Sequence, residues 1–182
     1  MKKIKLHLGC GKRNFGSDWI HIDGGSFTHL EYYDVTRLEF GNNTVDTIYA
    51  SHLIEYFSRN EIGPILNEWN RVLTPNGTLR VAVPDFESMS NLYVKSKLPL
   101  ASILGPLYGE LKMGESTIYH KTVYDFESIS RLFLDHGFTN AHRYDWRETD
   151  HSEHDDHSQA YIPHMDKEHG TLISLNVECQ KI

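Results

Sequence analysis

The sequence predicts an α/β fold of the Rossmann-like, doubly wound type, with a mostly parallel sheet, helices on both faces and an antiparallel last strand. Apolar runs of strand length alternate along the chain with segments whose apolar residues recur at helical spacing. Such alternation favours a parallel sheet with right-handed crossovers. A glycine turn directly follows the first apolar run. In sheets of this type, ligands bind outside the carboxyl ends of the strands.

Six apolar runs have the pattern of strands. The last run alternates apolar residues such as Leu175 and Val177 with polar residues such as Asn176, which is typical of a strand. The fourth run is ended by Pro84. Strands are therefore expected at residues 4–8, 19–22, 45–51, 78–83, 138–146 and 171–179.

The first helix is expected between residues 62 and 73, where apolar residues follow the spacing of an amphipathic helix. Ser58 and Glu61 precede it with the spacing of a capping box. Pro64 implies that the regular helix starts late or kinks in its first turn. Asparagine and glycine in residues 74–77 supply a stop and a turn.

The remaining segments are a lid-like stretch, a second helix and an insertion. Prolines and glycines break residues 86–122 into short helical pieces, with a loop expected at 109–117. Asp125 caps a clear helix that ends at Gly137. Residues 147–170 are an insertion between two strands, longer than the usual connection.

Length and composition indicate one domain over residues 1–182, with 39% hydrophobic residues and no apolar run long enough to span a membrane. The net charge of −7 argues against nucleic acid as the main partner, because binding to phosphates needs a basic surface. The two cysteines, Cys10 and Cys179, lie in strand and turn patterns, so reduced thiols and a cytoplasmic location are expected.

The turn after the first strand and the acid after the second suit a cofactor that contains adenosine. Gly9 and Gly11 let a ligand approach the backbone, and Asp23 suits a pair of ribose hydroxyls. A dinucleotide motif needs a third glycine earlier than Gly16. Residues 12–18 are too few for a crossover helix that could bind a pyrophosphate. A cofactor without phosphate is therefore favoured.

At these residues the chain resembles the class I S-adenosylmethionine-dependent methyltransferases, especially small members that begin Leu-His-Leu-Gly-Cys-Gly. Segments 50–55, 68–77 and 121–138 also match the family's pattern in order and spacing. Tyr56 departs from it, because many relatives have a histidine there. The resemblance implies S-adenosylmethionine as the cofactor.

The resemblance and the strand ends together give a set of site residues. Asp34 matches the family residue that faces the adenine amino group, with Val35 behind the ring, whereas a loop cap is the alternative for Asp34. Cys10 is expected to pack rather than react. The expected cofactor-binding residues are Gly9, Cys10, Gly11, Asp23, Gly24, Asp34, Val35, Ser51 and His52. Because the first connection is short, the pocket is expected to be covered by Phe15, Trp19 or the partner subunit of a homodimer.

Methyl transfer is an in-line displacement in which most of the rate can come from positioning. A hydroxyl acceptor also benefits from a general base. The candidate bases are His52, Asp85, His120 and His164. We expect a small-molecule or sugar hydroxyl as acceptor. A non-catalytic S-adenosylmethionine-binding module and, less favoured, a nicotinamide-dependent reductase are the alternatives.

The insertion allows three interpretations. Residues 159–165 mix aromatic, apolar and hydrogen-bonding groups, which favours an acceptor-binding flap in which Tyr161 and His164 contact the substrate. A plain surface loop is the second. On a helix, His151, His154 and His157 would share one face, so metal binding is the third, although no cysteine joins them. No metal site is predicted.

Overall fold

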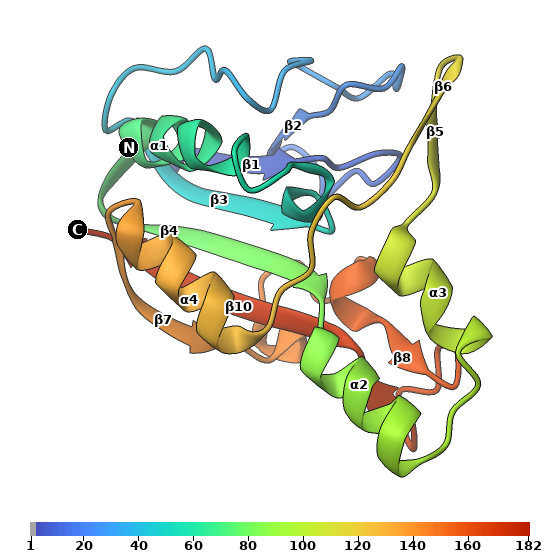
Figure 1. Cartoon of the computed structure of the whole chain (residues 1–182). Helices are drawn as coiled ribbons and strands as arrows, with labels where there is room; N and C mark the ends of the chain where they lie inside the picture. Colours follow the sequence, from blue (N-terminus) through green and yellow to red (C-terminus); the bar gives the residue numbers. More distant parts are fainter. Residues whose placement is uncertain (1–2) are drawn as a thin grey trace.

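The centre of the structure, a computed structural model that describes residues 3–182, is a six-stranded sheet (Figure 1). The strands are β1 (Lys5–Leu8), β2 (Ile20–Ile22), β3 (Val45–Ser51), β4 (Leu73–Pro84), β7 (Phe138–Arg143) and β10 (Ser174–Lys181). They lie in the order β2-β1-β3-β4-β10-β7. The first four are parallel, and β10 is antiparallel to both neighbours. This confirms the predicted α/β fold with a mostly parallel sheet and an antiparallel last strand.

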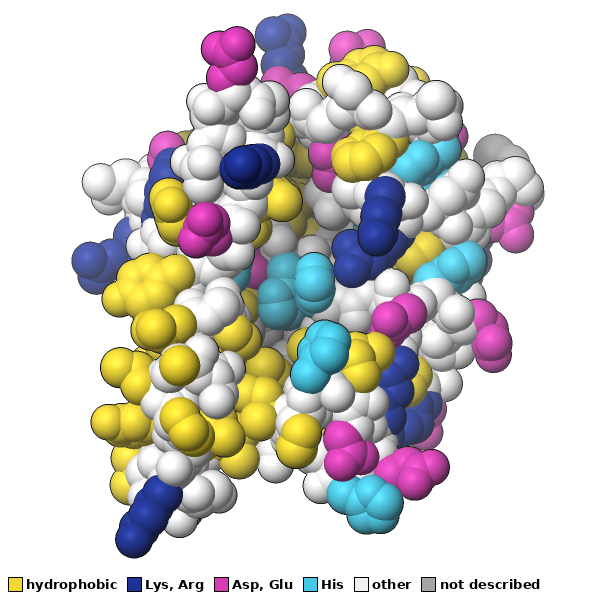
Figure 2. Space-filling view, turned by 90° about the vertical axis from the view of Figure 1, so that its right-hand side faces the viewer, with side chains coloured by type: hydrophobic (Ala, Val, Ile, Leu, Met, Phe, Trp, Pro, Cys, Tyr) yellow, Lys and Arg dark blue, Asp and Glu magenta, His cyan; other side chains and the backbone are white. Residues whose placement is uncertain are grey.

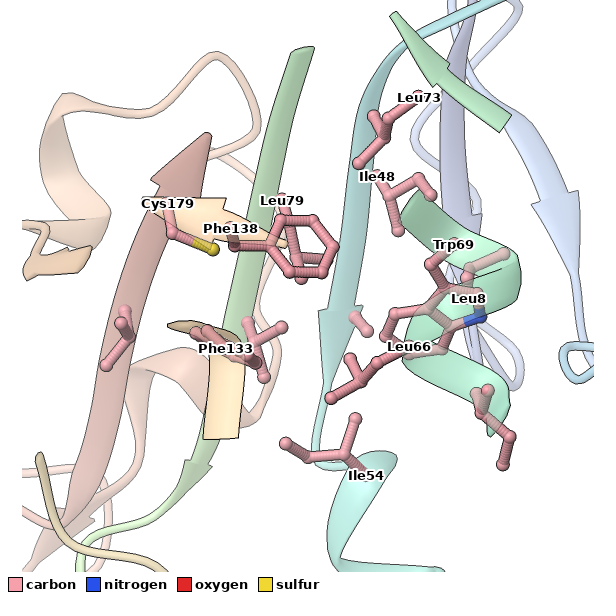
Figure 3. Packing of buried hydrophobic residues seen from close by; sticks show 14 of the residues in the cluster. Leu8, Ile48, Ile54, Leu66, Trp69, Leu73, Leu79, Phe133, Phe138 and Cys179 are labelled. Atoms are coloured by element: carbon pink, nitrogen blue, oxygen red, sulfur yellow. The ribbon is translucent and has the colours of Figure 1, made fainter. Parts of the chain in front are cut away.

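Two helices, α1 (Ile62–Val72) and α4 (Phe126–Asp135), cover one face of the sheet (Figure 1). Trp69 of α1 and Phe133 of α4 are fully buried there. Figure 3 shows both rings among aliphatic side chains from β1, β3 and β4. Each fully buried apolar side chain of this kind contributes about 1.5–3 kcal/mol relative to exposure. This layer is therefore the main hydrophobic core.

The helix starts follow the local sequence. Asp125 accepts a hydrogen bond from the backbone N–H of Ser128 at 2.8 Å, and the Ser128 hydroxyl oxygen accepts from the Asp125 N–H, which completes a capping box. Only half of the predicted box before α1 forms, where Glu61 accepts from the Ser58 N–H at 2.7 Å. Pro64 lies in the first turn of α1, where its missing N–H breaks no helical hydrogen bond. The helix therefore begins at Ile62, within the predicted range and before the proline, so the alternative of a late start is not realised.

Rings and loops cover the opposite face of the sheet. Phe15 and Trp19, from the connection between β1 and β2, form a buried cluster with Tyr49 of β3. The ring of His7 stacks on Phe15 with centroids 4.0 Å apart, and the ring of His151 lies 4.1 Å from that of Tyr49. Aromatic and imidazole rings thus lie where the α-helix of a first crossover would otherwise pack.

Two local predictions need correction in detail. The stop and turn expected at residues 74–77 follow the end of α1: Asn76 has a φ of 61°, and a Cβ on Gly77 would lie 2.8 Å from the Thr74 carbonyl oxygen. These residues lie within the bounds of β4, but the pairing with β3 passes from Leu73 to Thr78, so they form a bulge in the strand. The expected loop at the end of the lid-like segment contains a hairpin of β5 (Leu111–Met113) and β6 (Ser116–Ile118), in which Gly114 adopts a φ of 59°.

The lid-like segment 86–122 consists of α2 (Phe86–Lys95), α3 (Ala101–Tyr108) and this hairpin, and it lies beyond the carboxyl end of β4 (Figure 1). The insertion and its surroundings contain η2 (Trp146–Glu148), η3 (His157–Gln159), β8 (Tyr161–Ile162) and β9 (Thr171–Leu172). Because β9 pairs with β8, the predicted last strand is divided between β9 and β10. Within residues 3–182, no helix is long and apolar enough to cross a membrane.

Candidate active site

The carboxyl ends of β1, β2, β3 and β4 lie at one end of the sheet, on the right-hand side of Figure 1. Gly9, Asp23 and Asp85 directly follow β1, β2 and β4, and Ser51 ends β3. Figure 2 shows this end of the molecule, where histidine side chains lie in a central hollow beside Lys and Arg side chains. Residues far apart in the sequence thus meet at one edge.

Asp23 ties the glycine turn to the loop that follows β2. Its Oδ2 accepts from the backbone N–H of Gly11 at 2.8 Å, and its Oδ1 accepts from the N–H of Gly25 at 2.7 Å. A carboxylate oxygen has two lone pairs, so each oxygen can still accept from a ligand hydroxyl. Gly9 and Gly11 have φ values of 65° and 56°, which favour glycine. The carboxylate is therefore fixed in a position that suits vicinal hydroxyls.

Free space and an unpaired polar group lie beside this turn. A Cβ atom added to Gly11 would meet no atom within 4 Å, whereas one added to Gly9 would lie 2.9 Å from Leu53 Cδ1. The Ser51 hydroxyl is buried and has no hydrogen-bond partner in the described part of the chain. Both features fit a ligand that carries ribose and adenine and that approaches the backbone at Gly11.

Asp34 and Val35 lie in the loop that follows β2. Asp34 Oδ1 accepts from the N–H and the hydroxyl of Thr36 at 2.8 and 2.6 Å, and the Thr36 hydroxyl lowers the pKa of Asp34. The carbonyl of Val35 accepts from Trp69 Nε1 at 2.8 Å, which ties the loop to α1. Asp34 thus caps its own loop through one oxygen, and Oδ2 is the atom left for an adenine amino group.

Cys10 and Gly24, also expected at the cofactor, have tighter surroundings. Burial, followed by the nearby Asp23 carboxylate, raises the pKa of the Cys10 thiol to about 12, so this residue is a neutral packing group. A Cβ on Gly24 would lie 3.1 Å from Met113 Cε, so the β5–β6 hairpin reaches the loop after β2.

His52, Glu55 and His120 form a buried acid–imidazole group next to the glycine turn. His52 follows β3, Glu55 lies in η1 (Ile54–Tyr56), and His120 belongs to the lid-like segment. Glu55 is 0% exposed, and its Oε1 lies 3.4 Å from His52 Nδ1 and 3.7 Å from His120 Nε2. Neither oxygen of Glu55 has a hydrogen-bond partner among the described residues.

The environment of this group keeps all three side chains uncharged near neutral pH. Burial raises the pKa of Glu55 to about 8. Burial, together with the nearby His157, lowers the pKa of His52 well below its ordinary value, and burial also lowers the pKa of His120. Burial thus favours the uncharged form of each of these three side chains.

A pocket of about 350 Å³ adjoins His120. Its other walls include the apolar side chains of Phe86, Leu107, Tyr108 and Val123. The pocket lies between α2, α3 and the segment that carries His120, so the lid-like segment supplies its walls.

Asp85 is a structural residue here, contrary to its prediction as a base. Its Oδ1 accepts from the N–H of Ser88 as the N-cap of α2, and its Oδ2 accepts from Arg143 at 3.2 Å. The side chain is 3% exposed. The buried side chain therefore caps α2 and pairs with Arg143, and these contacts offer no support for its predicted role as a base.

Tyr161 and His164 do not join the acid–imidazole group. The Tyr161 hydroxyl accepts from Trp146 Nε1 at 3.3 Å and from Arg147 at 3.0 Å, within the insertion and its border. His164 is exposed in the turn after β8. Their predicted role at the acceptor finds no support in the geometry.

The other histidines of the insertion have separate surroundings. His151 and His154 stack on Phe15, with ring centroids 5.2 and 4.7 Å away, and His157 in η3 lies 5.0 Å from the ring of His52. They do not share a helix face. Between residues 3 and 182, no group of three or more His, Cys, Asp or Glu side chains is arranged to hold a metal ion.

Solved structures of methyltransferases share this fold over nearly the whole chain. An S-adenosylmethionine-dependent methyltransferase from Archaeoglobus fulgidus is 14% identical, with a TM-score of 0.60 over 98% of this chain and 86% of that one. One from Methanosarcina mazei is 15% identical, with a TM-score of 0.59 over 100% and 94%. The 1,6-didemethyltoxoflavin-N1-methyltransferase of Burkholderia thailandensis, solved with 1,6-didemethyltoxoflavin and S-adenosylhomocysteine, is 11% identical, with a TM-score of 0.55 over 98% and 70%. The fold is thus the Rossmann-like fold of these methyltransferases.

Sequence comparison finds a similarity over part of the chain. A family model described as a methyltransferase domain matches residues 24–81, whereas no curated protein matches the chain. Over this part of the chain, the sequence is similar to the methyltransferase domains that the model describes, in agreement with the shared fold.

Glu55 is the site residue that sequence reasoning missed as a functional group. It lies in segment 50–55, which resembles the family, but a glutamate before a helical turn is ordinarily solvated at a helix start. Its burial depends on His120, 65 residues later in the sequence. Only the folded arrangement brings the two together.

Proposed function

We propose that the chain is an S-adenosylmethionine-dependent methyltransferase that acts on a hydroxyl group of a small molecule or sugar, and that His120 is the general base. The observation that supports this proposal is the imidazole of His120 on the wall of a pocket, with a pKa that burial lowers. A base whose pKa lies below neutral is already unprotonated at neutral pH and can accept the acceptor's proton.

The cofactor supplies a methyl group on a sulfonium that carries its own leaving group. In this proposal Asp23 binds the ribose, Asp34 binds the adenine amino group and Ser51 donates to the cofactor from inside the site. His120 takes the proton from the acceptor hydroxyl, while the apolar walls of the pocket hold the acceptor and exclude water. Positioning supplies most of the rate.

The net charge of −7 and the two free, buried cysteines support further proposals: a small-molecule acceptor instead of nucleic acid, and a cytoplasmic location. The chain acts as a single domain whose lid-like segment 86–122 shapes the acceptor site. Because Phe15 and Trp19 are buried within one chain, their cover needs no partner subunit, so a homodimer is not required.

Ligand binding is tested first. Thermal-shift measurements with S-adenosylmethionine, S-adenosylhomocysteine, NAD and NADP should show stabilisation by the first two alone, since a ligand that binds only the folded state raises Tm. Stabilisation by NAD or NADP instead would favour a reductase.

Transfer of a labelled methyl group to a panel of sugar and small-molecule hydroxyls is tested next. His120→Gln should lower the rate by about 10²–10⁴-fold with unchanged cofactor affinity. The exposed His169→Gln is the matched control and should behave as wild type. Cofactor binding without transfer to any acceptor would favour a non-catalytic binding module.

A further inference from the structure

Hydrogen bonds on the far side of His52 determine which of its nitrogens carries hydrogen. Asn176 Nδ2 donates to the carbonyl of Ser158 at 2.9 Å, so the amide oxygen of Asn176 is the acceptor for the Ser174 hydroxyl, also at 2.9 Å. Ser174 Oγ therefore presents only lone pairs to His52 Nε2, 3.4 Å away. Nε2 carries the hydrogen, and the Nδ1 that faces Glu55 is bare.

His120 is constrained in the same way from the lid-like segment. Its Nδ1 lies 3.1 Å from the carbonyl oxygen of Pro106, which can only accept, so Nδ1 carries the hydrogen. The Nε2 that faces Glu55 is bare as well. The backbone N–H groups of Lys121 and Thr122 donate to the carbonyl of Glu55 at 2.8 and 3.3 Å, which holds the two segments together.

Two bare nitrogens therefore point at one buried carboxyl group that has no other partner. An ionised carboxylate would face two lone pairs, whereas a carboxylic acid can donate to either imidazole after a small rotation. We propose that Glu55 holds a proton between His52 and His120 and is thereby the positioning residue that orients the His120 imidazole at the acceptor pocket.

The other ionisable groups around this carboxyl are compatible with a neutral acid. The phenols of Tyr56 and Tyr124 are its other ionisable neighbours, and their pKa values are raised, so both are neutral. Arg13 and His157 act on His52 and disfavour a charge there. No described cation lies within ion-pair distance of Glu55 to stabilise a carboxylate; its two charge partners are the imidazoles themselves. The raised pKa of Glu55 agrees with this arrangement.

The catalytic consequence rests on the proposed function. When His120 Nε2 accepts a proton from the acceptor hydroxyl, the proton of Glu55 passes to His52 Nδ1. Because the single lone pair of His120 Nε2 serves one partner at a time, the ring turns from Glu55 to the acceptor hydroxyl before this transfer. The resulting carboxylate accepts a hydrogen bond from His52 Nδ1 and lies beside the His120 imidazolium. No atom is gained or lost, and the one extra positive charge is shared across the group.

The protonation itself is tested without an acceptor. An infrared band of a protonated carboxyl should be present in the wild type at pH 7 and absent in Glu55→Gln. Nitrogen NMR of labelled histidines should show hydrogen on His52 Nε2 and His120 Nδ1. An ionised Glu55 at pH 7, or the opposite tautomers, would overturn the proposal whatever the enzyme methylates.

The pH dependence of stability measures the protonation of Glu55 independently of the spectra. Since Glu55 keeps its proton on folding while the unfolded chain releases it, the wild type should take up about one proton more on folding than Glu55→Gln between pH 5 and 7.5. Buried histidines such as His52 and His151 release protons on folding in both proteins, so the Tm of the wild type relative to that of Glu55→Gln should fall with rising pH. In Glu55→Gln this contribution to the slope should disappear. Glu61→Gln is the control, because Glu61 is exposed and paired with Lys121, and it should keep the wild-type slope.

A role in positioning also predicts a kinetic signature. In Glu55→Gln the amide can still donate to an imidazole but cannot become charged, so kcat should fall at least tenfold with little change in KM, and the pH profile should lose its limb near pH 8. An unchanged pH profile in a folded Glu55→Gln would contradict the positioning role. If the infrared and NMR results hold but no hydroxyl is methylated, the proposed function fails while the protonation of Glu55 stands.

Discussion

Replacing Asp23 with alanine tests the cofactor site most directly. The change removes the acceptor of two backbone hydrogen bonds, from Gly11 at 2.8 Å and Gly25 at 2.7 Å, and the proposed acceptor of the ribose hydroxyls. A hydrogen bond to a charged group contributes about 1.5–3 kcal/mol, and partial exposure puts these two at or below the low end. We therefore expect a loss of about 2 kcal/mol of stability, or about 4–8 °C in Tm for a domain of this size.

The affinity for the cofactor should fall separately from the stability. Losing the ribose contacts should cost about 1–3 kcal/mol, which is about 5- to 150-fold in Kd. Calorimetry with S-adenosylhomocysteine at a temperature where both proteins are folded measures this. Asp135→Ala, which removes an exposed ion pair with Arg131 on α4, should leave Kd unchanged. An unchanged Kd in Asp23→Ala would refute the assignment of the glycine turn and its acid to the cofactor.

Three other changes have distinct expected outcomes. Gly11→Ala should weaken S-adenosylhomocysteine binding in calorimetry with only a small fall in Tm, because its Cβ enters open space. In Gly9→Ala, at a similar φ, Tm should fall further because the added Cβ contacts a side chain. Asp85→Ala should lower the free energy of unfolding by about 1 kcal/mol in urea titrations, because the N-cap acceptor of the Ser88 N–H is lost, without changing cofactor affinity. Burial lowers the pKa of His151 to about 4, so as pH falls this imidazole is protonated in the unfolded chain before it is protonated in the folded one. Up to about 3 kcal/mol of stability should therefore be lost between pH 6.5 and 4, and His151→Phe should reduce this loss.

The parts of the fold that could be predicted from the sequence are those with local signals. The glycine turn, the short first connection and the capping residue Asp125 each act within a few residues, and the structure has all three. The segment 74–77 has the residues of a turn, and it is skipped by the pairing with β3, which passes from Leu73 to Thr78. Its local preference is therefore kept as a bulge, and pairing on either side of it sets the bounds of β4.

The site could be predicted only in part, for a similar reason. Asp23 follows a strand end, which the sequence reveals, whereas the burial of Glu55 requires that η1 and the lid-like segment meet. Tyr161 and His164 lie in a segment whose composition suggested ligand contacts, but the Tyr161 hydroxyl is engaged by Trp146 instead. The composition of this segment indicated aromatic and hydrogen-bonding contacts, but not whether their partner is a ligand or the protein itself.

The face of the sheet covered by rings also has a consequence for how the chain folds. Its contacts join the first fifty residues to the insertion: Tyr49 donates to Asp156 at 2.5 Å across 107 positions, and Arg13 donates to the Asp155 carbonyl across 142. A crossover helix would cover β1 as soon as β2 formed, whereas this cover arrives only when the C-terminal quarter of the chain has been made. Contacts of such long range slow folding. During synthesis, the nascent N-terminal strands therefore emerge with one face bare and must wait for residues 150–156 before that face is closed.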